Sequence, residues 1–421
     1  MQKVQDLPRI ESARGMVTLM VSHCAGMLDL VALPLWVGTL VAHYRFNPQQ
    51  AGTLPTLFLI GASLSSMFFA AHFNRVNAKW TAVIGFAAAA LAFALCFGQS
   101  TMAALAPLHF AGGLAVGAAL SSTHGTIGRA LNPHRVFAWA GLAIGIFGIV
   151  FFGATPEVLT KFGGATLFIV FAGTMGLAAV MGLLFFPRPS REIAEDRHRS
   201  SVRVQPLSWA VWYSIVGIAL LAMTQAMTLS FYERIGMARG FGREMVTLAL
   251  VIYGIVALVP APLAGLLEKR IKATTVISIG PIMQAVCAMI VTHTWSYPMF
   301  AASGALMAFT ILFTHTYAFG LLARLDATGR AVAATPAMLM VGAAIAPFLA
   351  GTLVKFIGFN AIGYAAIALV AIQLLLFNLT RRAVAQTGDI RAGLMKSVDE
   401  LSAPAGDCRE EVWPEEGRRS R

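Results

Sequence analysis

Charged side chains are scarce in this sequence, and their scarcity excludes a water-soluble globular protein. Only 12% of the 421 residues are charged, whereas roughly 25% are charged in a soluble domain. Hydrophobic residues make up 57% of the chain. Such a composition does not supply enough polar groups to cover the surface of a soluble protein of this length. The sequence therefore predicts a multi-pass protein of the cytoplasmic (inner) cell membrane.

The signatures of catalysis and of metal or nucleotide binding are also missing. The four cysteines have no CxxC spacing, and three of them lie in apolar runs. The sequence has no GxxxxGK[ST], HExxH or G-x-G-x-x-G motif, which would bind a nucleotide phosphate, zinc or a dinucleotide. We therefore expect no metal site, no cofactor and no enzyme. Without an ATP-driven engine, any transport must use an ion gradient or the gradient of the solute itself.

Apolar stretches long enough to cross a bilayer recur along the chain, separated by short polar breaks. We predict twelve spans at 16–42, 51–72, 79–98, 102–126, 136–156, 164–186, 208–232, 244–267, 273–293, 297–322, 331–354 and 358–380. The predicted fold is therefore an all-α membrane protein with twelve transmembrane helices.

The distribution of basic residues orients these spans. With the amino terminus in the cytoplasm, 25 of the 31 Lys and Arg residues fall in cytoplasmic segments and 6 in outer ones. Positive charge accumulates on the cytoplasmic side of membrane proteins, so we predict that both termini are cytoplasmic. Topology and the lipid bilayer then account for the net charge of +12, and no nucleic-acid partner is needed.

An internal repeat divides the chain into two halves. "LTKFGG" at 159–164 matches "LVKFIG" at 353–358, and "RALNPHR" at 129–135 matches "RLDATGR" at 324–330. The offsets of 194 and 195 residues are nearly equal, and both pairs bridge the arginine-rich segment near the midpoint. Secondary transporters are often built from repeated halves with the substrate site between them. We predict homologous six-helix halves at 1–186 and 208–382, a cytoplasmic central loop at 187–207, and a disordered cytoplasmic tail at 383–421.

The loop between the second and third spans carries a family resemblance. "AAHFNRVNAK" at 70–79 resembles the G-x-x-x-D-R-x-G-R-K loop of the major facilitator superfamily, with Arg75 and Lys79 matching and Asn74 in place of the acid. The resemblance covers about residues 14–382. It implies a transporter with alternating access between two six-helix halves, and it assigns a charge-relay role to Asn74, Arg75 and Lys79.

One carboxylate interrupts the first span. Asp29 is the only acid that we place deep in the bilayer, and no Lys or Arg falls at the centre of a span. Acids inside membrane spans are rare and are functional candidates by default. We predict that Asp29 couples proton movement to transport, being charged when open to water and neutral while buried. The structural alternative is a neutral Asp29 that hydrogen-bonds a neighbouring helix.

Other polar and aromatic residues within the spans are candidates for the wall of a substrate cavity. Helical spacing places Ser22, Asp29 and Trp36 roughly on one face of the first span. The remaining candidates are Gln225 and Thr228 in the seventh span and His315 and Tyr317 in the tenth. For Gln225 a hydrogen bond to an adjacent helix is an equally good explanation, and a lone histidine such as His315 is more often a packed residue.

These features favour a proton-coupled secondary active transporter, working as a symporter or antiporter, for a small organic solute. We expect it to be a functional monomer whose partners are the solute, the proton gradient and the lipid bilayer. A drug-type proton antiporter that works in efflux is the alternative within this class. A membrane receptor or assembly protein that has lost transport activity is the alternative outside it.

Overall fold

The computed structural model describes residues 9–402, except residues 74, 132, 188–206, 268–269 and 326–334. The side chains of residues 133–134, 261, 323–324, 335–336 and 384–402 are also outside the description. Most of the predicted central loop, Asn74 and the chain after Ser402 therefore lie outside the described residues. Regular structure in the described ranges consists of α-helices, which confirms the all-α prediction.

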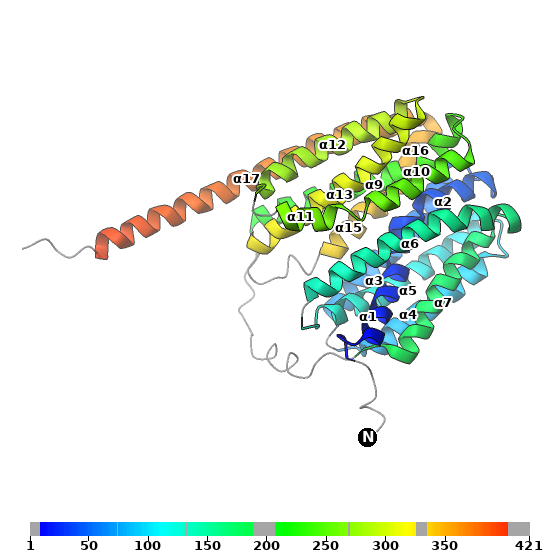
Figure 1. Cartoon of the computed structure of the whole chain (residues 1–421), viewed down its shortest axis with the longest axis horizontal. Helices are drawn as coiled ribbons and strands as arrows, with labels where there is room; N and C mark the ends of the chain where they lie inside the picture. Colours follow the sequence, from blue (N-terminus) through cyan, green and yellow to red (C-terminus); the bar gives the residue numbers. More distant parts are fainter. Residues whose placement is uncertain are drawn as a thin grey trace, which may run out of the picture.

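The described helices fall into the two predicted halves (Figure 1). The helices of the first half are α1 (Ala13–Gly26), α2 (Leu28–Ala42), α3 (Pro48–Ala71), α4 (Ala78–Cys96), α5 (Met102–Ile127), α6 (Pro133–Phe162) and α7 (Thr166–Phe185). Those of the second half are α9 (Trp209–Ala238), α10 (Arg243–Val256), α11 (Pro260–Leu267), α12 (Ala273–His293), α13 (Tyr297–Leu325), α15 (Thr335–Ala344), α16 (Ala346–Phe356) and α17 (Asn360–Ser402).

Eleven of the twelve predicted spans coincide with helices, or pairs of successive helices, that are long and apolar enough to cross a membrane in the described part of the chain. The predicted eighth span, 244–267, is divided into α10 and α11, each too short to cross alone. Pro260 begins α11, and a proline cannot donate the backbone hydrogen bond that a continuous helix would need there. The twelve predicted spans are confirmed as helical regions, and the eighth is interrupted.

Large apolar side chains cover the outside of the helices. Exposed examples lie along α4, α6, α7 and α12: Ile84, Leu91, Ile146, Val150, Leu177, Val180, Ile282 and Val286. A soluble monomer rarely exposes contiguous apolar surface on this scale. These faces contact lipid, as expected of a multi-pass membrane protein.

Buried apolar side chains join the two halves at one end of the molecule and separate toward the other. The largest cluster contains residues of both halves, among them Leu40 and Phe58 of the first and Phe231 and Ala350 of the second. Toward the opposite end, one cluster around Leu322 belongs to the second half alone. Another, around Ile127, belongs to the first half alone. The large shared core therefore lies toward one end, and a small cluster of Met27, Ala62, Leu120 and Met340 adds a further contact between the halves.

We call the end with the shared core the closed end. It contains the carboxyl ends of α2, α6, α9 and α16 and the amino ends of α3 and α10. Three hydrogen bonds join the halves there: Lys355 to Gln49, the Phe348 amide to Thr56, and Arg243 to Thr160. Under the predicted topology, the closed end faces the outside of the cell.

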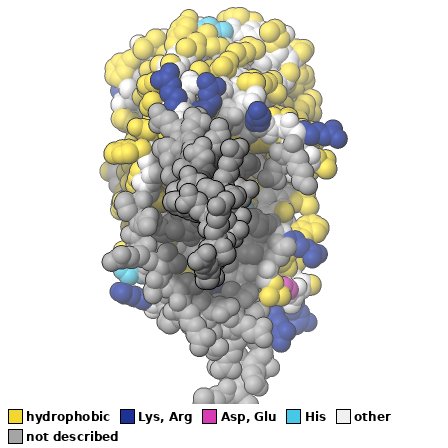
Figure 2. Space-filling model, turned by 90° about the vertical axis from the view of Figure 1, so that its left-hand side faces the viewer, with side chains coloured by type: hydrophobic (Ala, Val, Ile, Leu, Met, Phe, Trp, Pro, Cys, Tyr) yellow, Lys and Arg dark blue, Asp and Glu magenta, His cyan; other side chains and the backbone are white. Residues whose placement is uncertain are grey.

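The opposite end carries basic side chains. Figure 2 faces this end, and dark-blue Lys and Arg side chains stand out on it. The described basic residues of the predicted cytoplasmic segments include Arg14, Arg75, Lys79, Arg129 and Arg270. The distribution agrees with the positive-inside pattern on which the predicted topology rests.

The prediction of a disordered tail is wrong for its first part. Helix α17 continues through Ser402 (Figure 1), so residues 383–402 are helical. Apolar residues recur there at helical spacing, at Ile390, Leu394, Val398 and Leu401. This periodicity favours a helix with one apolar face even among polar residues.

Candidate functional site

The first predicted span is broken beside its acid. Met27 lies between α1 and α2 with φ −109° and ψ 22°, outside helical geometry. Asp29 lies in the first turn of α2, where unpaired backbone N–H groups give the helix end a partial positive charge. The position favours a carboxylate. The break also changes the rotation between α1 and α2, so Ser22 and Asp29 do not share one continuous helical face.

Asp29 is buried, with 2% of its surface exposed. Its Oδ1 atom has no hydrogen-bond partner among the described residues. No basic side chain pairs with it in the described part of the chain, where the ion pair found joins Lys161 and Glu157. Because an isolated buried charge is costly, this conformation favours the neutral form of Asp29.

Trp36 lies in the interior of the first half and does not line a cavity wall, contrary to the prediction. Its side chain is fully buried, and its ring contacts Phe58 and Phe171 at centroid distances of 5.3 and 4.8 Å. Its indole N–H donates to Nε2 of His109 at 3.3 Å. Asp29 lies seven residues earlier on α2, which places its Cα on the same side of that helix as the Cα of Trp36.

Ser22 is buried as well, with 1% of its surface exposed and its hydroxyl without a hydrogen-bond partner in the described residues. It lies on α1, before the break at Met27. Ser22 therefore lies on a different helix from Asp29 and Trp36, which are on α2.

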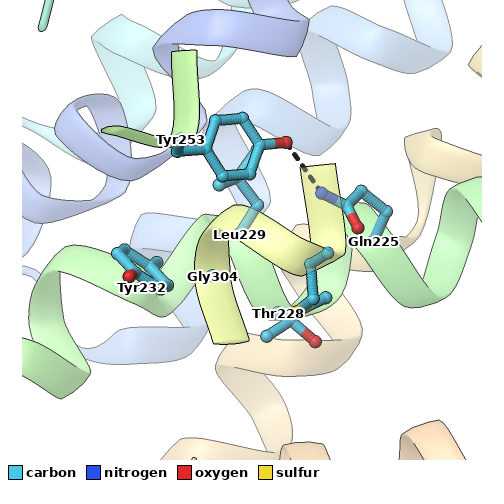
Figure 3. A pocket seen from close by; sticks show the side chains of 7 residues that line it. Gln225, Thr228, Leu229, Tyr232, Tyr253 and Gly304 are labelled. Carbon is cyan, nitrogen blue, oxygen red and sulfur yellow. Dashed lines mark hydrogen bonds between the residues drawn. The ribbon is translucent and has the colours of Figure 1, made fainter. Parts of the chain in front are cut away.

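Gln225 and Thr228 do line a pocket in the second half. The pocket lies between α9, α10 and α13, and its walls are Gln225, Thr228, Leu229, Tyr232, Tyr253, Gly304 and Met307 (Figure 3). It holds about 160 Å³ of space between side chains, none of it wide enough for a water molecule. The lining is formed by amide, hydroxyl and apolar groups and contains no charged residue.

The amide of Gln225 also joins neighbouring helices. Its Nε2 donates to the Tyr253 hydroxyl at 2.7 Å, and its Oε1 accepts from Nε2 of Gln284 at 3.0 Å. Gln284 retains an Oε1 atom without a partner in the described residues. Gln225 therefore bonds to adjacent helices and also lines the pocket, and its contact with a substrate stays a prediction.

The two candidates in the tenth span lie apart from this pocket. Tyr317 is buried in the apolar cluster around Leu322, with Phe313 at a centroid distance of 5.0 Å. His315 is half-buried and stacks on Phe319 at 4.9 Å. These contacts describe packed residues of the second half.

The loop that carries the family resemblance is only partly described. Arg75 is exposed, and Lys79 lies in the first turn of α4 with its Nζ atom 5.9 Å from the Trp80 ring centroid. Asn77 stands where the family pattern has glycine. Its side chain accepts from the Trp80 amide at 3.2 Å and caps α4, which explains why this loop tolerates the change.

Two side-chain contacts in the structure were not predicted from the sequence. His23 of α1 and His124 of α5 stack at 5.1 Å, with Nδ1 of His23 2.9 Å from Nε2 of His124. Glu233 of α9 packs against Gly38 of α2 at the closed end, where an added Cβ on Gly38 would lie 1.4 Å from its Oε2 atom. Gly38 and Glu233 are 195 residues apart, so they occupy corresponding positions of the two repeated halves, but the repeat does not specify that they touch.

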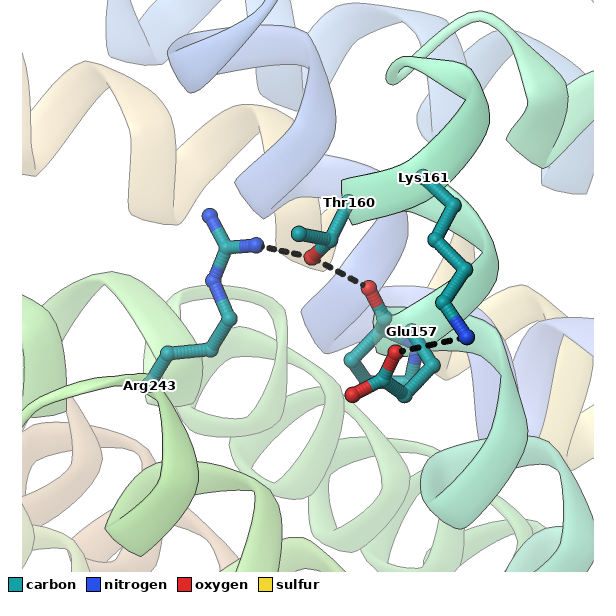
Figure 4. Close-up of polar contacts among 5 residues, drawn as sticks. Glu157, Thr160, Lys161 and Arg243 are labelled. Atoms are coloured by element: carbon teal, nitrogen blue, oxygen red, sulfur yellow. Dashed lines mark hydrogen bonds and ion pairs between the residues drawn. The ribbon is translucent and has the colours of Figure 1, made fainter.

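The polar contacts beside Glu233 close the interface between the halves. Arg243, at the start of α10, reaches Thr160 near the end of α6 (Figure 4). Lys161, which follows Thr160 on α6, pairs with Glu157 one turn earlier at 3.6 Å in an exposed position. Exposed ion pairs contribute little to stability, so the contact across the interface is the more informative one.

Comparisons with known proteins agree with this architecture. A family model described as Major Facilitator Superfamily matches residues 18–324. No curated protein matches the chain by sequence.

Solved structures share the fold at low sequence identity. A POT family transporter in complex with a thioalcohol-conjugated peptide is 14% identical, with a TM-score of 0.67, over 90% of this chain and 100% of that chain. A POT family transporter in complex with 5-aminolevulinic acid is 13% identical, with a TM-score of 0.68, over 90% and 99%. A mutant of the nucleoside transporter NupG is 12% identical, with a TM-score of 0.65, over 87% and 99%.

Proposed function

The chain belongs to the major facilitator superfamily, and on that premise we propose that it is a proton-coupled secondary active transporter of a small organic solute. Transport proceeds by alternating access, in which the two six-helix halves rock against each other. The shared core at the closed end and the separate clusters toward the other end support this proposal. An apolar interface of this kind favours one of two packed arrangements over intermediate ones.

The observation that carries proton coupling is the buried carboxyl of Asp29, which has a partnerless Oδ1 atom. A charged carboxylate without a cation costs several kcal/mol in a protein interior. A conformation that buries Asp29 therefore favours a bound proton, and one that exposes it to water favours release. This difference between conformations is what can link proton movement to solute movement.

The pocket around Gln225 and Thr228 supports a neutral or amphipathic solute. Its walls offer the amide of Gln225, the hydroxyl groups of Tyr253 and Thr228, and apolar surface, without a charged group to pair with an ion. Since the pocket is too narrow for water in this conformation, solute entry requires α9 to move relative to α10 or α13. The solved neighbours are POT family transporters in complex with a thioalcohol-conjugated peptide and with 5-aminolevulinic acid, and the nucleoside transporter NupG. We extend only the transport of small organic molecules to this chain.

The test is transport by the purified protein in proteoliposomes with an imposed pH gradient. A panel of neutral, zwitterionic and amphipathic small molecules is first screened by the thermal stabilisation of the wild-type protein. We expect at least one stabilising molecule to accumulate against its gradient and to change the internal pH. Internal acidification on solute entry indicates symport, whereas internal alkalinisation indicates the drug-type antiport mechanism.

The variant Asp29→Asn resembles the protonated side chain in size and lacks its charge. We expect it to lose proton-driven accumulation while keeping solute exchange at equal pH. Glu244→Gln, which removes an exposed carboxylate at the closed end, is the control and should transport like the wild type. Full accumulation by Asp29→Asn would reduce Asp29 to a packing residue. Binding without any flux in the wild type would favour the receptor alternative.

A further inference from the structure

We propose that Glu233 is a second proton-binding site, and that a proton bound there is required for the closed end to remain closed. The inference deepens the proposed function and rests on it for its role in transport. It starts from the contact between Glu233 and Gly38, which brings a carboxyl group of the second half onto a helix of the first.

The carboxyl group of Glu233 occupies the space that a side chain at position 38 would fill. A Cβ added to Gly38 would lie 1.4 Å from Oε2 and 2.5 Å from Cδ of Glu233. Only glycine leaves room for such an approach. The fit places the carboxyl group between α2 and α9 for as long as the closed end stays together.

One oxygen of this carboxyl group is buried without a partner, although Glu233 as a whole is half-buried. Its Oε2 atom has no solvent exposure and no hydrogen-bond partner in the described residues. Arg234 and Arg243 are the charged neighbours whose fields reach it. Neither forms an ion pair with it within 4.0 Å in the part of the chain that the structure describes.

The elements packed against α9 offer no better partner near this position. Helix α2 has no titratable side chain between Leu30 and Thr39. Four basic or titratable side chains of this region contact other groups: Arg243 contacts Thr160, Lys355 contacts Gln49, His293 contacts Tyr364, and Arg239, which follows α9, contacts Thr292 and Asn360. The hydroxyl of Tyr297 on α13 is buried without a hydrogen-bond partner among the described residues and carries no charge to pair with a carboxylate. Glu244 is exposed.

Closure and protonation of Glu233 are therefore linked. An ionised carboxylate held against Gly38 loses water at Oε2 and gains no ion pair within 4.0 Å among the described residues, which is unfavourable. Separation of α2 from α9 would return water to the carboxylate and leave it near Arg234 and Arg243, which stabilise its charge. Protonation thus favours the closed end and deprotonation favours its opening.

The linkage gives Glu233 a different task from Asp29. Asp29 lies at the start of α2, nine residues before Gly38, whereas Glu233 lies at the contact between α2 and α9. A proton entering from the closed end meets Glu233 first. Its binding then permits closure, which commits the transporter to opening at the other end.

Distance measurements between the halves test this proposal without knowledge of the solute. Spin labels are placed at Phe162→Cys and Ile357→Cys, which are exposed residues of different halves at the closed end, after the native cysteines are replaced by alanine. Pulsed electron paramagnetic resonance in nanodiscs then gives the populations of short and long distances from about pH 5 to about pH 9, a range that covers carboxyl groups whose titration burial moves upward by several units. In the protein with Glu233 intact, the ratio of the long-distance to the short-distance population should rise by about tenfold as the pH rises.

The variants separate proton binding at Glu233 from other causes. Glu233→Gln should keep the short distances at all pH values, while Glu244→Gln should behave like the unmodified protein. Glu233→Asp keeps a carboxyl group and should keep a pH response, which protects the test if the glutamine variant folds poorly. An unchanged pH response in Glu233→Gln would overturn the proposal, as would loss of the response in both Glu233 variants.

The same measurement keeps this inference distinct from the proposed function. Asp29→Asn should still show pH-dependent distances, although it loses proton-driven accumulation. If no solute proves to be proton-driven but the distances still depend on Glu233, the proton site stands and the proposed function falls. If accumulation depends on Asp29 but the distances do not depend on Glu233, the proposed function stands and the proton site at Glu233 is refuted.

Discussion

Adding a single methyl group at the contact between α3 and α16, by a glycine-to-alanine substitution, should favour opening of the closed end. Gly351 of α16 packs on the backbone of α3, where an added Cβ would lie 2.2 Å from the Pro48 carbonyl oxygen. Gly52 of α3 packs in the same way on the Pro347 carbonyl oxygen, at 2.0 Å. These two reciprocal glycines allow the helix backbones to touch, as small residues do between membrane helices.

Gly351→Ala should therefore force the two helices apart. Ordinary van der Waals contact begins at 3.4 Å, so the backbones must separate by about 1 Å to admit the methyl group. Overpacking of this kind costs about 1–3 kcal/mol. Because only the closed conformation contains this contact, the ratio of open to closed molecules should rise by about 5- to 150-fold relative to the unmodified protein.

The spin-label pair at Phe162 and Ile357 measures this shift at constant pH. Gly153→Ala is the matched control, since Gly153 lies on α6 with no atom within 4 Å of an added Cβ. The control should leave the distances unchanged. If Gly351→Ala also leaves them unchanged, the contact between α3 and α16 does not hold the closed end, and the reasoning is refuted.

Two further predictions concern topology and the interior of the first half. Reporter fusions at residue 195 and at the carboxyl end should both report a cytoplasmic location, because basic residues gather on that side; reports from opposite sides would remove the twelve-span topology. Trp36→Ala should lower the midpoint of thermal unfolding, since emptying a site of this size in a packed interior costs about 3–5 kcal/mol. Trp209→Ala, at a residue that is 73% exposed, should change the midpoint little, and equal effects of the two variants would contradict the placement of Trp36.

The division of the chain into spans was predictable because the bilayer imposes it. A helix that crosses hydrocarbon must be apolar over about 20 residues, and this requirement is written in local composition. The interruption of the eighth span also had a local signal, in the prolines at 260 and 262. The helix of residues 383–402 was missed because its polar composition outweighed the spacing of its apolar residues.

The candidate site was predictable only in part. The burial of Asp29 followed from its place in an apolar run, and the place of Gln225 in a polar wall followed from the spacing within one helix. Trp36 was assigned to the wrong environment because a sequence shows which residues share a helical face but not which neighbour that face meets. The break at Met27 added to the error by changing the rotation between α1 and α2.

The sequence by itself determined that this chain is a membrane protein of two repeated halves with an acid buried in its first span. Hydrophobic length, the placement of basic residues and the repeat offset are local or one-dimensional properties, so they can be read without coordinates. Only the tertiary structure decided that Glu233 meets Gly38 and that Gly351 meets the backbone of Pro48. These contacts join residues 195 and 303 positions apart, and they depend on how two whole halves pack together, which no local pattern specifies.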